Sequence, residues 1–486
     1  MCGIAGIWGK KANSESSVFR STRLLRHRGP DGIAVVADEH AALGHRRLSI
    51  VDLRNGGQPL YNEDRSVAVV YNGEIYNHEA LRAQLAHDHV FASASDGEVL
   101  PHLLESEEPE AACRRLRGMF AVAAVTAQGL VLARDPLGIK PLYWSRTGDT
   151  IAFASELAAM TPLGASESVE IFPPGHVFTS RDGLRPYWAL PDVEPLPPEV
   201  DIDTEAIGLL EVVRLAVRRR LMSDVPIGIF LSGGLDSSLI AALAVEALPG
   251  LQTFAVGTPD SPDLDAARRI AATLGTRHKE IHIDRDRIEA FAPTIVRRLE
   301  SDDHDLFASA IPTFFLSQAA AKHVKVVLTG EGADELFAGY AYHRAYLGDP
   351  ARLDAELRRS VSSLHGINLQ RVDRMTMAHG IEARVPFLDV DVVRFALSVP
   401  IAHKIDAVAN KIVLRAAAAL VLPKWVVERP KAVFADGTGA ASIVESVWGD
   451  EAALREFLSR QFRSSFPEPY TRLSARWQDG RVTASA

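Results

Sequence analysis

Cysteine is scarce in this sequence: Cys2 and Cys113 are the two present among 486 residues. Two cysteines cannot form a disulfide framework or an all-cysteine zinc site, so we expect a chain that works in a reducing cytoplasm. Uncharged apolar runs are also short, and none approaches the roughly 18 residues of a membrane-spanning helix. The N-terminus lacks the pattern of a secretory signal peptide. These absences argue against disulfide-rich secreted proteins and integral membrane proteins.

An excess of positive charge is missing as well. The 53 Lys and Arg residues are outnumbered by 62 Asp and Glu residues, and the formal net charge is -9. Such a balance disfavours binding to nucleic acid or to an anionic membrane surface by bulk electrostatics. Hydrophobic residues make up 47% and charged residues 24%, as in a folded globular protein rather than a disordered one. We therefore expect small-molecule substrates as partners, and the oligomeric state, a homodimer included, stays open.

A proline-rich stretch divides the chain. At about 100–200 residues per domain, the length predicts two or three domains. Proline fixes φ and lacks an N–H donor, so a cluster of prolines favours an extended linker. We place this linker at residues 191–203, between a first domain of residues 2–190 and a second of residues 204–486. The prolines that mark it are Pro186, Pro191, Pro195, Pro197 and Pro198.

The two domains show different patterns of secondary structure. In the first, strand-like runs at residues 67–71 and 119–125 accompany helix-like spacing at 78–86 and 98–105, which favours a layered α+β fold. In the second, strands and helices alternate, which predicts a parallel α/β sheet, and the pattern becomes mostly helical after Gly339. The expected strands cover residues 227–231, 252–256, 279–283 and 325–328, and the expected helices cover residues 204–221, 237–248, 264–274 and 311–323.

Cys2 follows the initiator methionine and is a candidate nucleophile. If Met1 is removed, the α-amino group of Cys2, with an ordinary pKa of about 7.7–8.0, can act as base for its own thiol. That activation matters because an unperturbed thiol, with a pKa of about 8.5, is mostly protonated at neutral pH. Taken alone, Cys2 is better explained as a buried cysteine near a terminus, and it is the residues downstream that favour catalysis.

Downstream residues complete the requirements for removing the amide group of an amino acid. Such a site needs a cation for the α-carboxylate, an anion for the α-ammonium group, and hydrogen-bond donors for the oxyanion of the tetrahedral intermediate. Arg47 can supply the cation and Asp96 the anion. Asn72, with the backbone of Gly73, can supply the oxyanion donors. Each residue alone is an ordinary surface or turn residue, but together they form a specific set.

An expected strand and an expected helix are joined by the sequence Leu231-Ser232-Gly233-Gly234-Leu235-Asp236-Ser237-Ser238. Adjacent glycines let a ligand approach the backbone closely, and the serine hydroxyls with the free N–H groups of the helix N-terminus suit a pyrophosphate group. Asp236 would repel phosphate unless it binds Mg²⁺. The loop lacks the Gly-Lys-Ser/Thr ending of a Walker A motif. A plain turn with a capping Ser or Asp would explain a shorter motif, but it does not explain the full sequence of residues 231–238 between an expected strand and an expected helix.

A second expected strand ends in a similar way. Residues 329–340 read Thr-Gly-Glu-Gly-Ala-Asp-Glu-Leu-Phe-Ala-Gly-Tyr and contain Glu331 and Asp334. Because ligands of open α/β sheets bind beyond the carboxyl ends of the strands, we expect both to face the crevice that holds Asp236. One carboxylate there can ligate a metal ion, and another can deprotonate incoming ammonium. As an alternative, the positive end of a helix dipole would explain the two acidic residues, but it does not explain the glycines around them.

Four N-terminal segments resemble the class II glutamine amidotransferase domain, whose fold is the αββα sandwich of N-terminal-nucleophile hydrolases. They are Cys2-Gly3-Ile4, His27-Arg28-Gly29-Pro30-Asp31, Arg47-Leu48-Ser49-Ile50-Val51-Asp52 and Asn72-Gly73-Glu74-Ile75-Tyr76-Asn77. The loop at residues 231–238 resembles the PP-loop of N-type ATP pyrophosphatases, which release AMP and pyrophosphate. With further matches at residues 254–264, 380–389 and 431–437, nearly the whole chain resembles the glutamine-hydrolysing asparagine synthetase family.

The resemblance implies a ligase that transfers ammonia from glutamine to a carboxylate activated by Mg-ATP, giving an amide, AMP and pyrophosphate. Its second domain would be a parallel sheet like that of adenine nucleotide α-hydrolases, with a helical C-terminal part. Roles in hydrolysis are implied for Cys2 (nucleophile), Asn72 and Gly73 (oxyanion hole), and Arg47, Glu74, Asn77 and Asp96 (glutamine binding). Roles in synthesis are implied for Ser232, Gly233, Gly234, Asp236, Ser237 and Ser238 (pyrophosphate), Leu231, Val256 and Gly330 (adenosine), Asp236 and Asp334 (Mg²⁺), Glu331 (base) and Lys431 (charge on the acyl-adenylate).

Two separate sites require transport of the nitrogen between them. Adenylation gives a carboxylate a good leaving group, AMP, but the ammonia that attacks it is mostly ammonium in neutral water. A closed route from Cys2 to the second site would avoid protonation and loss of ammonia.

One segment departs from the family. Residues 300–312 usually read Glu-Thr-Tyr-Asp-Val-Thr-Thr-Ile-Arg-Ala-Ser-Thr-Pro, whereas here they read Glu-Ser-Asp-Asp-His-Asp-Leu-Phe-Ala-Ser-Ala-Ile-Pro. Ala308 takes the arginine position, and Asp305 and Leu306 replace threonines. We therefore expect aspartate to be a poor acceptor and a more apolar or differently charged carboxylic acid to be preferred, unless Arg344 or Arg374 compensates.

Two alternatives remain at this stage. A non-catalytic glutamine or nucleotide sensor has no need of the nucleophile Cys2 or the base Glu331, which opposes that hypothesis. A sugar-phosphate amidotransferase would share Cys2 but has no need of the loop at residues 231–238.

Overall fold

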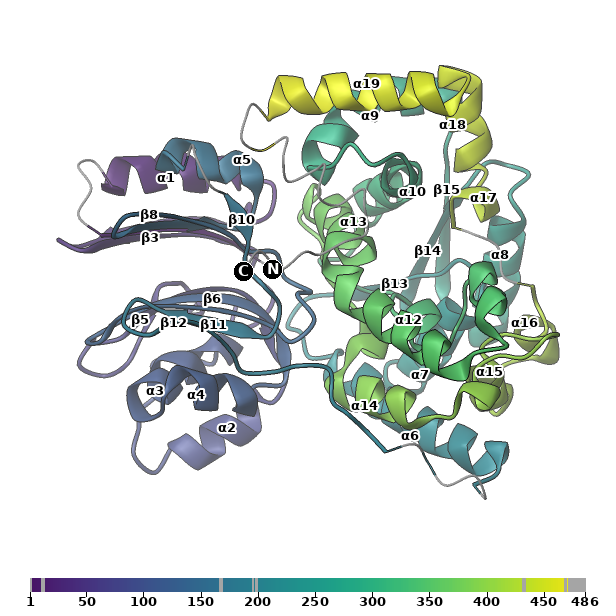
Figure 1. Ribbon diagram of the computed structural model, residues 1–486, viewed down its shortest axis with the longest axis horizontal. Helices are drawn as coiled ribbons and strands as arrows, with labels where there is room; N and C mark the ends of the chain where they lie inside the picture. Colours follow the sequence, from purple (N-terminus) through teal and green to yellow (C-terminus); the bar gives the residue numbers. More distant parts are fainter. Residues whose placement is uncertain are drawn as a thin grey trace.

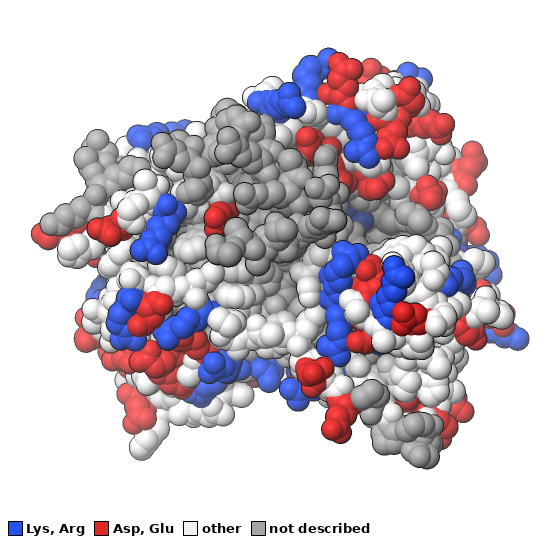
Figure 2. Space-filling model, in the orientation of Figure 1, with Lys and Arg blue, Asp and Glu red and all other residues white. Residues whose placement is uncertain are grey.

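The computed structural model describes residues 2–9, 14–165, 169–194, 196, 200–430, 434–466 and 470. Its strands form three sheets in two halves, which lie side by side in Figure 1. The N-terminal half holds the strands up to residue 186, and the C-terminal half holds those from residue 227. Positive and negative side chains are interspersed over the face seen in Figure 2. Among the described residues, no helix is long and apolar enough to cross a membrane.

The N-terminal half is a sandwich of two antiparallel six-stranded sheets, with orders β10-β8-β9-β1-β3-β2 and β12-β11-β7-β6-β5-β4. Helices α1 and α5 cover the first sheet, and α2, α3 and α4 cover the second (Figure 1). The first sheet contains β1 (Gly3–Trp8), β2 (Gly32–Ala37), β3 (Ala41–Arg47), β8 (Tyr143–Thr147), β9 (Thr150–Ala154) and β10 (Glu170–Ile171). The second contains β4 (Leu60–Tyr61), β5 (Ala68–Ile75), β6 (Gly118–Thr126), β7 (Gly129–Arg134), β11 (His176–Thr179) and β12 (Gly183–Pro186). The helices are α1 (Ser14–Leu24), α2 (His78–Leu85), α3 (Val99–Ser106), α4 (Pro109–Arg115) and α5 (Leu157–Met160).

Alternation of side chains along the strands produces the core between these two sheets. Ile4 and Phe153 from the first sheet and Val70 and Leu132 from the second belong to one buried cluster. Successive residues of a strand point to opposite faces, so each sheet also offers a second apolar face to its helices. The result is the αββα layering expected from the sequence.

The C-terminal half is built on a parallel five-stranded sheet with the order β15-β14-β13-β16-β17. The chain runs outward from β13 to β14 and β15, then returns to place β16 on the other side of β13. The switch point therefore lies between β13 and β16, where ligands of such sheets bind. The strands are β13 (Ile227–Phe230), β14 (Gln252–Gly257), β15 (Arg277–His282), β16 (Val326–Leu328) and β17 (Glu382–Arg384).

Helices account for most of the remaining C-terminal half, as the sequence indicated. The first group contains α6 (Ile202–Arg219), α7 (Leu235–Ala247), α8 (Pro262–Leu274), α9 (Arg285–Leu299), α10 (His304–Ala320) and α11 (Ala333–Leu336). The second contains α12 (Pro350–Ser363), α13 (Asn368–Met377), α14 (Val390–Ser398), α15 (Ile412–Ala419), α16 (Lys424–Val427), α17 (Phe434–Gly437), α18 (Ala440–Trp448) and α19 (Glu451–Ser465).

Each strand and helix expected from the sequence is present, with its ends moved by a few residues in most cases. The largest shift is at α10, which begins at His304 instead of residue 311. Asp303 explains the earlier start because its carboxylate accepts a hydrogen bond from the Leu306 N–H and caps the helix. The short strand β17 lies within the stretch expected to be mostly helical and was missed, because three residues carry too little periodicity.

Candidate active sites

Cys2 lies directly before β1, at the side of the sandwich that faces the C-terminal half. The residue is buried, and its backbone nitrogen donates a hydrogen bond to Asn72 Oδ1 at 3.0 Å. Its carbonyl oxygen accepts a bond from Arg28 Nε at 3.1 Å. Burial raises the pKa of the Cys2 thiol, so the thiol is mainly protonated at neutral pH until a base accepts its proton.

Asn72 and Gly73 lie next to this cysteine on β5. The Asn72 side chain is fully buried, and its Nδ2 has no hydrogen-bond partner among the described residues. A buried amide donor without a partner is costly unless a ligand completes it. Gly73 pairs with Phe120 on β6, and a Cβ at this position would come within 2.0 Å of the Met119 carbonyl oxygen. Only glycine therefore fits this point of the strand.

Two carboxylates, Glu74 and Asp96, are buried in the same half. Asp96 accepts hydrogen bonds from the Tyr71 hydroxyl and the Ile75 N–H, each at 2.7 Å. Burial raises the pKa of Asp96, and it raises that of Glu74 well above the usual range. Arg384 Nη2, 3.7 Å from Glu74 Oε1, opposes this rise only partly. An added cation, such as an α-ammonium group, would lower the free-energy cost of ionising both buried carboxyl groups.

The other two residues expected to bind glutamine have backbone partners. Arg47, at the end of β3, donates from Nη2 to the Asp52 carbonyl at 2.5 Å and so holds the loop that follows. Asn77 donates to the Arg115 carbonyl and accepts from the Arg117 N–H, each at 2.9 Å. Through these hydrogen bonds, Asn77 connects the start of α2 to the turn after α4.

In the C-terminal half, the loop between β13 and α7 lies at the carboxyl end of the central strand. Its two serines contact each other, with 3.0 Å between the Oγ atoms of Ser232 and Ser237. Ser238 Oγ is buried without a partner among the described residues. Gly233 has a φ of +69°, and a Cβ there would come within 2.5 Å of the Ala266 backbone. Glycine is therefore required by both the backbone conformation and the packing.

The loop after β16 meets this one at the switch point of the sheet. A Cβ at Gly330 would lie 3.0 Å from the Cβ of Asp236. Leu231, at the end of β13, and Val256, near the end of β14, are buried close by in the same sheet. The structure therefore brings the ends of three neighbouring strands together, as the sequence predicted for a nucleotide site.

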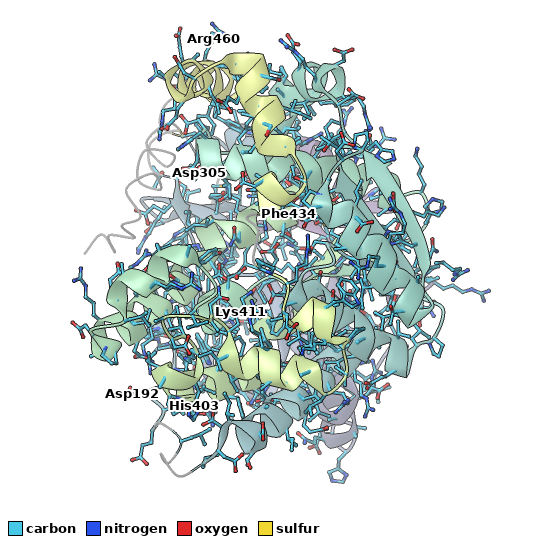
Figure 3. All side chains as sticks on the ribbon, turned by 90° about the vertical axis from the view of Figure 1, so that its right-hand side faces the viewer. Asp192, Asp305, His403, Lys411, Phe434 and Arg460 are labelled. Carbon is cyan, nitrogen blue, oxygen red and sulfur yellow. The ribbon has the colours of Figure 1, made fainter. Side chains whose placement is uncertain are left out.

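Asp236 and Asp334 converge on one cation, the side chain of Lys411. Lys411 Nζ lies 2.8 and 2.7 Å from the two Asp236 oxygens and 2.6 Å from Asp334 Oδ1. Figure 3 shows Lys411 in the middle of the C-terminal half. Sequence reasoning missed this residue because it lies 175 positions after Asp236 and belongs to no glycine-rich loop.

Glu331 is paired with a second residue that the sequence did not reveal. Its Oε1 contacts Arg371 Nη2 from α13, and the Arg371 side chain is buried. Glu335, one turn later than Glu331, accepts a hydrogen bond from the Tyr340 hydroxyl at 2.6 Å. Burial and then the charge of Asp334 raise the pKa of Glu335 to about 7. Lys431, the remaining predicted catalytic residue, lies outside the described residues.

In the segment 300–312, the apolar side chains that an apolar acceptor would contact are buried. Phe307, Ala310 and Ile311 are fully buried in a hydrophobic core on the inner face of α10, and Leu306 is nearly so. Phe307 packs edge-to-face on Trp448. The expectation of a more apolar acceptor therefore loses the support of these apolar side chains, because they pack into the protein core.

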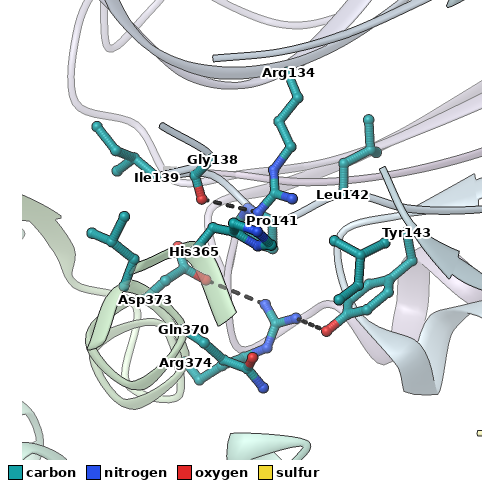
Figure 4. Close-up of a pocket in the computed structure, with 12 residues that line it drawn as sticks. Arg134, Gly138, Ile139, Pro141, Leu142, Tyr143, His365, Gln370, Asp373 and Arg374 are labelled. Carbon is teal, nitrogen blue, oxygen red and sulfur yellow. Dashed lines mark hydrogen bonds and ion pairs between the residues drawn. The ribbon is translucent and has the colours of Figure 1, made fainter. Parts of the chain in front are cut away.

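Arg374, a candidate to replace the arginine missing at position 308, is already paired within the protein. Its Nη2 lies 2.8 Å from Glu300 Oε2 and 3.2 Å from the Tyr143 hydroxyl. Figure 4 shows this group at a small pocket between the halves, with Arg134 and Tyr143 on one side and His365, Asp373 and Arg374 on the other. Arg374 therefore serves the interface between the halves, and its charge is already balanced.

Apolar side chains from the two halves also share one core. Leu48, Met119 and Ile139 from the N-terminal half belong to the same buried cluster as Leu231 and Val385 from the C-terminal half. The cluster thus joins the two halves and includes Leu231, the first residue of the loop between β13 and α7.

An αββα sandwich of the N-terminal-nucleophile type, joined to a parallel sheet of the nucleotide-binding type, defines a glutamine amidotransferase fused to an ATP-dependent ligase. The family models agree: a glutamine amidotransferase domain matches residues 1–199, and an asparagine synthase domain matches residues 208–351 and 347–474. The chain belongs to the glutamine-hydrolysing asparagine synthetase family. This confirms the fold class, the enzyme class and the use of ATP expected from the sequence.

Two asparagine synthetases are similar to this chain over most of its length. Asparagine synthetase [glutamine-hydrolyzing] 3 of Arabidopsis thaliana is 39% identical over 468 residues, which cover 90% of this chain and 79% of the relative. Asparagine synthetase B of Escherichia coli K12 is 35% identical over 500 residues, covering 96% and 88%. Among solved structures, a glutamine phosphoribosylpyrophosphate amidotransferase from B. subtilis is 19% identical over 57% of this chain and 65% of its own, with a TM-score of 0.33.

Proposed function

We propose that residues 2–190 hydrolyse glutamine at Cys2 and that residues 204–486 use the ammonia to amidate an adenylated carboxylate, with residues 191–203 as the linker. The observation that carries the first half of this proposal is the double role available to Asn72. Its Oδ1 already holds the nitrogen of Cys2, while its Nδ2 is buried and unpartnered among the described residues. One amide can thus orient the base and stabilise the oxyanion.

Hydrolysis would proceed after removal of Met1. The α-amino group of Cys2 accepts the thiol proton, and Sγ attacks the side-chain amide carbon of glutamine. Asn72 Nδ2 and the Gly73 N–H stabilise the oxyanion, and ammonia leaves with the proton from the α-ammonium group. Water then hydrolyses the thioester to release glutamate and restore the thiol. The buried carboxylates of Glu74 and Asp96 bind the α-ammonium group of glutamine, Arg47 binds its carboxylate, and Asn77 supports the site through its backbone contacts.

Synthesis would use the switch point of the parallel sheet. The serines and N–H groups of residues 232–238 hold the β- and γ-phosphates of ATP, while Leu231, Val256 and Gly330 line the adenosine pocket. The acceptor carboxylate attacks the α-phosphorus and pyrophosphate leaves. Ammonia then attacks the acyl carbon, Glu331 takes a proton from the nitrogen, and AMP leaves. Lys431 stabilises the charge of the acyl-adenylate.

Mg²⁺ fits the pair Asp236 and Asp334. Carboxylate oxygens are the preferred protein ligands of this ion, and the two side chains already share one cation, Lys411 Nζ. When bound with ATP, Mg²⁺ would neutralise charge on the phosphates. Asp236 and Asp334 would hold the ion, and Lys411 would supply a second positive charge to the same carboxylates.

Ammonia would cross between the halves through the interface, in keeping with the apolar cluster around Leu48, Met119 and Leu231. An apolar, water-poor path favours neutral ammonia over ammonium. The unpaired thiol of Cys2 must also stay reduced for this chemistry, which supports a cytoplasmic location.

Aspartate is the acceptor favoured by kinship, because the similar proteins are named asparagine synthetases. One observation favours another carboxylic acid: Ala308 replaces the cation of the family pattern, and the neighbouring Asp305 is exposed. A buried α-carboxylate without a cation is costly. Because the apolar side chains of this segment are buried, a differently charged acid, and not a hydrophobic one, is the second candidate.

The deciding experiment supplies glutamine, Mg-ATP and a panel of carboxylic acids, and measures AMP and the new amide. A kcat/KM for aspartate of about 10⁴ M⁻¹s⁻¹ or more, within the range of typical enzymes, would establish aspartate and exclude the second candidate. If aspartate is poor, Ala308→Arg should improve its kcat/KM without changing glutamine hydrolysis. Absence of acid-dependent AMP formation with the whole panel would overturn the adenylation proposal.

A further inference from the structure

Four side chains with metal-ligand chemistry gather on the helical side of the N-terminal half, and none of them belongs to the residues assigned to glutamine or ATP. Glu63 lies in the turn before β5, His89 in the loop after α2, and His102 and Glu105 on α3. One ligand atom from each lies within 4.8 Å of all the others. His102 and Glu105 are three positions apart and therefore share a face of the helix. The helical layer that carries them is at the lower left of Figure 1, and acidic side chains gather over it in Figure 2.

Two separations within this cluster, each from a different oxygen of Glu63, are close to those between the ligands of a small tetrahedral ion. Glu63 Oε1 lies 3.3 Å from His89 Nδ1, and Glu63 Oε2 lies 3.4 Å from His102 Nδ1. Bonds of about 2.0–2.1 Å to a tetrahedral zinc ion place neighbouring ligand atoms about 3.3–3.4 Å apart. Glu105 Oε2, at 3.9 Å from His89 Nδ1, belongs to a partly exposed side chain that can move closer.

His102 provides the independent sign of a missing ligand. Its side chain is fully buried, yet neither ring nitrogen has a hydrogen-bond partner among the described residues. Buried polar groups are almost always paired, so this imidazole calls for an explanation. A metal ion bound at Nδ1, which lies 3.4 Å from Glu63 Oε2, would give this buried nitrogen the partner that it lacks among the described residues.

The surroundings also orient the other ligands. His89 Nε2 lies 3.1 Å from Ser106 Oγ, so the hydroxyl can fix the ring and leave Nδ1 directed at the cluster. The Val90 N–H donates to Glu63 Oε1 at 2.7 Å. Contacts of this kind from outside the ligand set are typical of protein metal sites, where they fix tautomer and orientation.

We propose that Glu63, His89, His102 and Glu105 bind a divalent transition metal ion, with Zn²⁺ as the best match. Two imidazoles and two carboxylates suit zinc better than Mg²⁺ or Ca²⁺, which prefer oxygen ligands alone. Four protein ligands leave no open position, so the ion has a structural role. It fastens the turn before β5 and the loop at residues 86–95 to α3. That loop leads directly into Asp96, so the metal stabilises the approach to this carboxylate.

The test measures Zn²⁺ binding by the full-length chain in excess Mg²⁺, which keeps the oxygen-ligand sites occupied. His89→Gln and Glu105→Gln are compared with His87→Gln, a matched control whose side chain is 92% exposed and two positions from His89. We expect the wild type and His87→Gln to bind one equivalent of Zn²⁺ that His89→Gln loses, or binds at least 100-fold more weakly. Zn²⁺ should also raise the melting temperature of the wild type and His87→Gln, but not that of His89→Gln.

Cobalt substitution separates this site from the thiol of Cys2. Co²⁺ at the cluster should give the strong visible bands of tetrahedral nitrogen and oxygen coordination, and His89→Gln should abolish them. Bands dominated by sulfur-to-cobalt charge transfer and unchanged by His89→Gln would assign the ion to Cys2 and overturn the proposal. Equal Zn²⁺ stoichiometry and affinity in the wild type, His89→Gln and Glu105→Gln would overturn it as well.

Discussion

Arg28 and Asp373 join the two halves of the enzyme through two parallel hydrogen bonds. Nη1 of Arg28 lies 2.8 Å from Oδ2 of Asp373, and Nη2 lies 3.1 Å from Oδ1. Both side chains are buried, and Arg28 Nε also donates to the carbonyl of Cys2. One guanidinium therefore connects the backbone of Cys2 to the C-terminal half.

Asp373→Asn should destabilise the protein and impair glutamine hydrolysis more than ammonia-dependent synthesis. Asp373 also faces Arg374 and Lys140, so its loss leaves this buried group with excess positive charge although Arg28 keeps Glu156 as a partner. Removing one partner of a buried pair costs about 3–5 kcal/mol, and the remaining Glu156 should keep the loss at the lower end. Denaturant unfolding and the two activity assays measure these effects. Asp391→Asn is the control, because Asp391 pairs with Arg219 at the surface and should cost about 1 kcal/mol or less. Equal losses in both variants would show that the Arg28–Asp373 pair has no special role.

Cys2→Ala should abolish glutamine hydrolysis and leave amide synthesis from added ammonium chloride close to that of the wild type. The reason is that the nucleophile and the nucleotide loop lie in different halves. Cys113→Ala is the control, since Cys113 lies on α4 and is buried in the core that this helix shares with α3 and the second sheet. Glutaminase activity that persists in Cys2→Ala would contradict the assignment of the nucleophile.

The rate of Cys2 alkylation by iodoacetamide should rise with pH. Burial raises the pKa of this thiol, so the reactive thiolate is the minor form at neutral pH and increases about tenfold per pH unit below the pKa. Cys113, whose pKa burial raises to about 12, should stay unlabelled in the folded protein. Mass spectrometry of labelled peptides between about pH 6.5 and 8.5 gives both rates. A rate at Cys2 that does not change with pH would indicate a thiol that is already ionised.

Lys411→Met should abolish AMP formation and leave glutamine hydrolysis intact. Without the ammonium group, Asp236 and Asp334 face each other as like charges, which disturbs the arrangement of the nucleotide loop. Lys424→Met is the matched control, because Lys424 is 84% exposed. Pyrophosphate exchange into ATP is the measurement. Normal exchange in Lys411→Met would mean that the lysine does not contribute to the site.

Glu331→Gln should lower amide formation from saturating ammonia by about 10²–10⁴-fold, the usual contribution of a general base. Glutamine is nearly isosteric and keeps the contact with Arg371 as a neutral acceptor. Glutaminase activity of the same sample is the internal control. An unchanged synthesis rate would require a different base, and Glu335 is the nearest candidate because its pKa is raised to about 7.

Local patterns in the sequence determined the elements and the contiguous motifs. The position of residues 231–238 between a strand and a helix was predictable because these residues follow one another, and the structure places them there. Their role in binding a nucleotide stays a prediction. The strands and helices expected from periodicity are present for the same reason: alternation and 3.6-residue spacing depend only on near neighbours. Kinship with asparagine synthetases also followed from motifs of this kind.

Only the tertiary structure decided which distant residues meet. Arg28 and Asp373 are 345 positions apart, and Lys411 reaches Asp236 across 175 positions, so no periodicity connects them. The sequence also did not reveal that the Phe307 side chain points into the core, because this depends on where α10 begins and on what packs against the helix. Burial, charge balance and metal-ligand geometry are properties of chain segments brought together by folding, and the order of residues alone does not specify them.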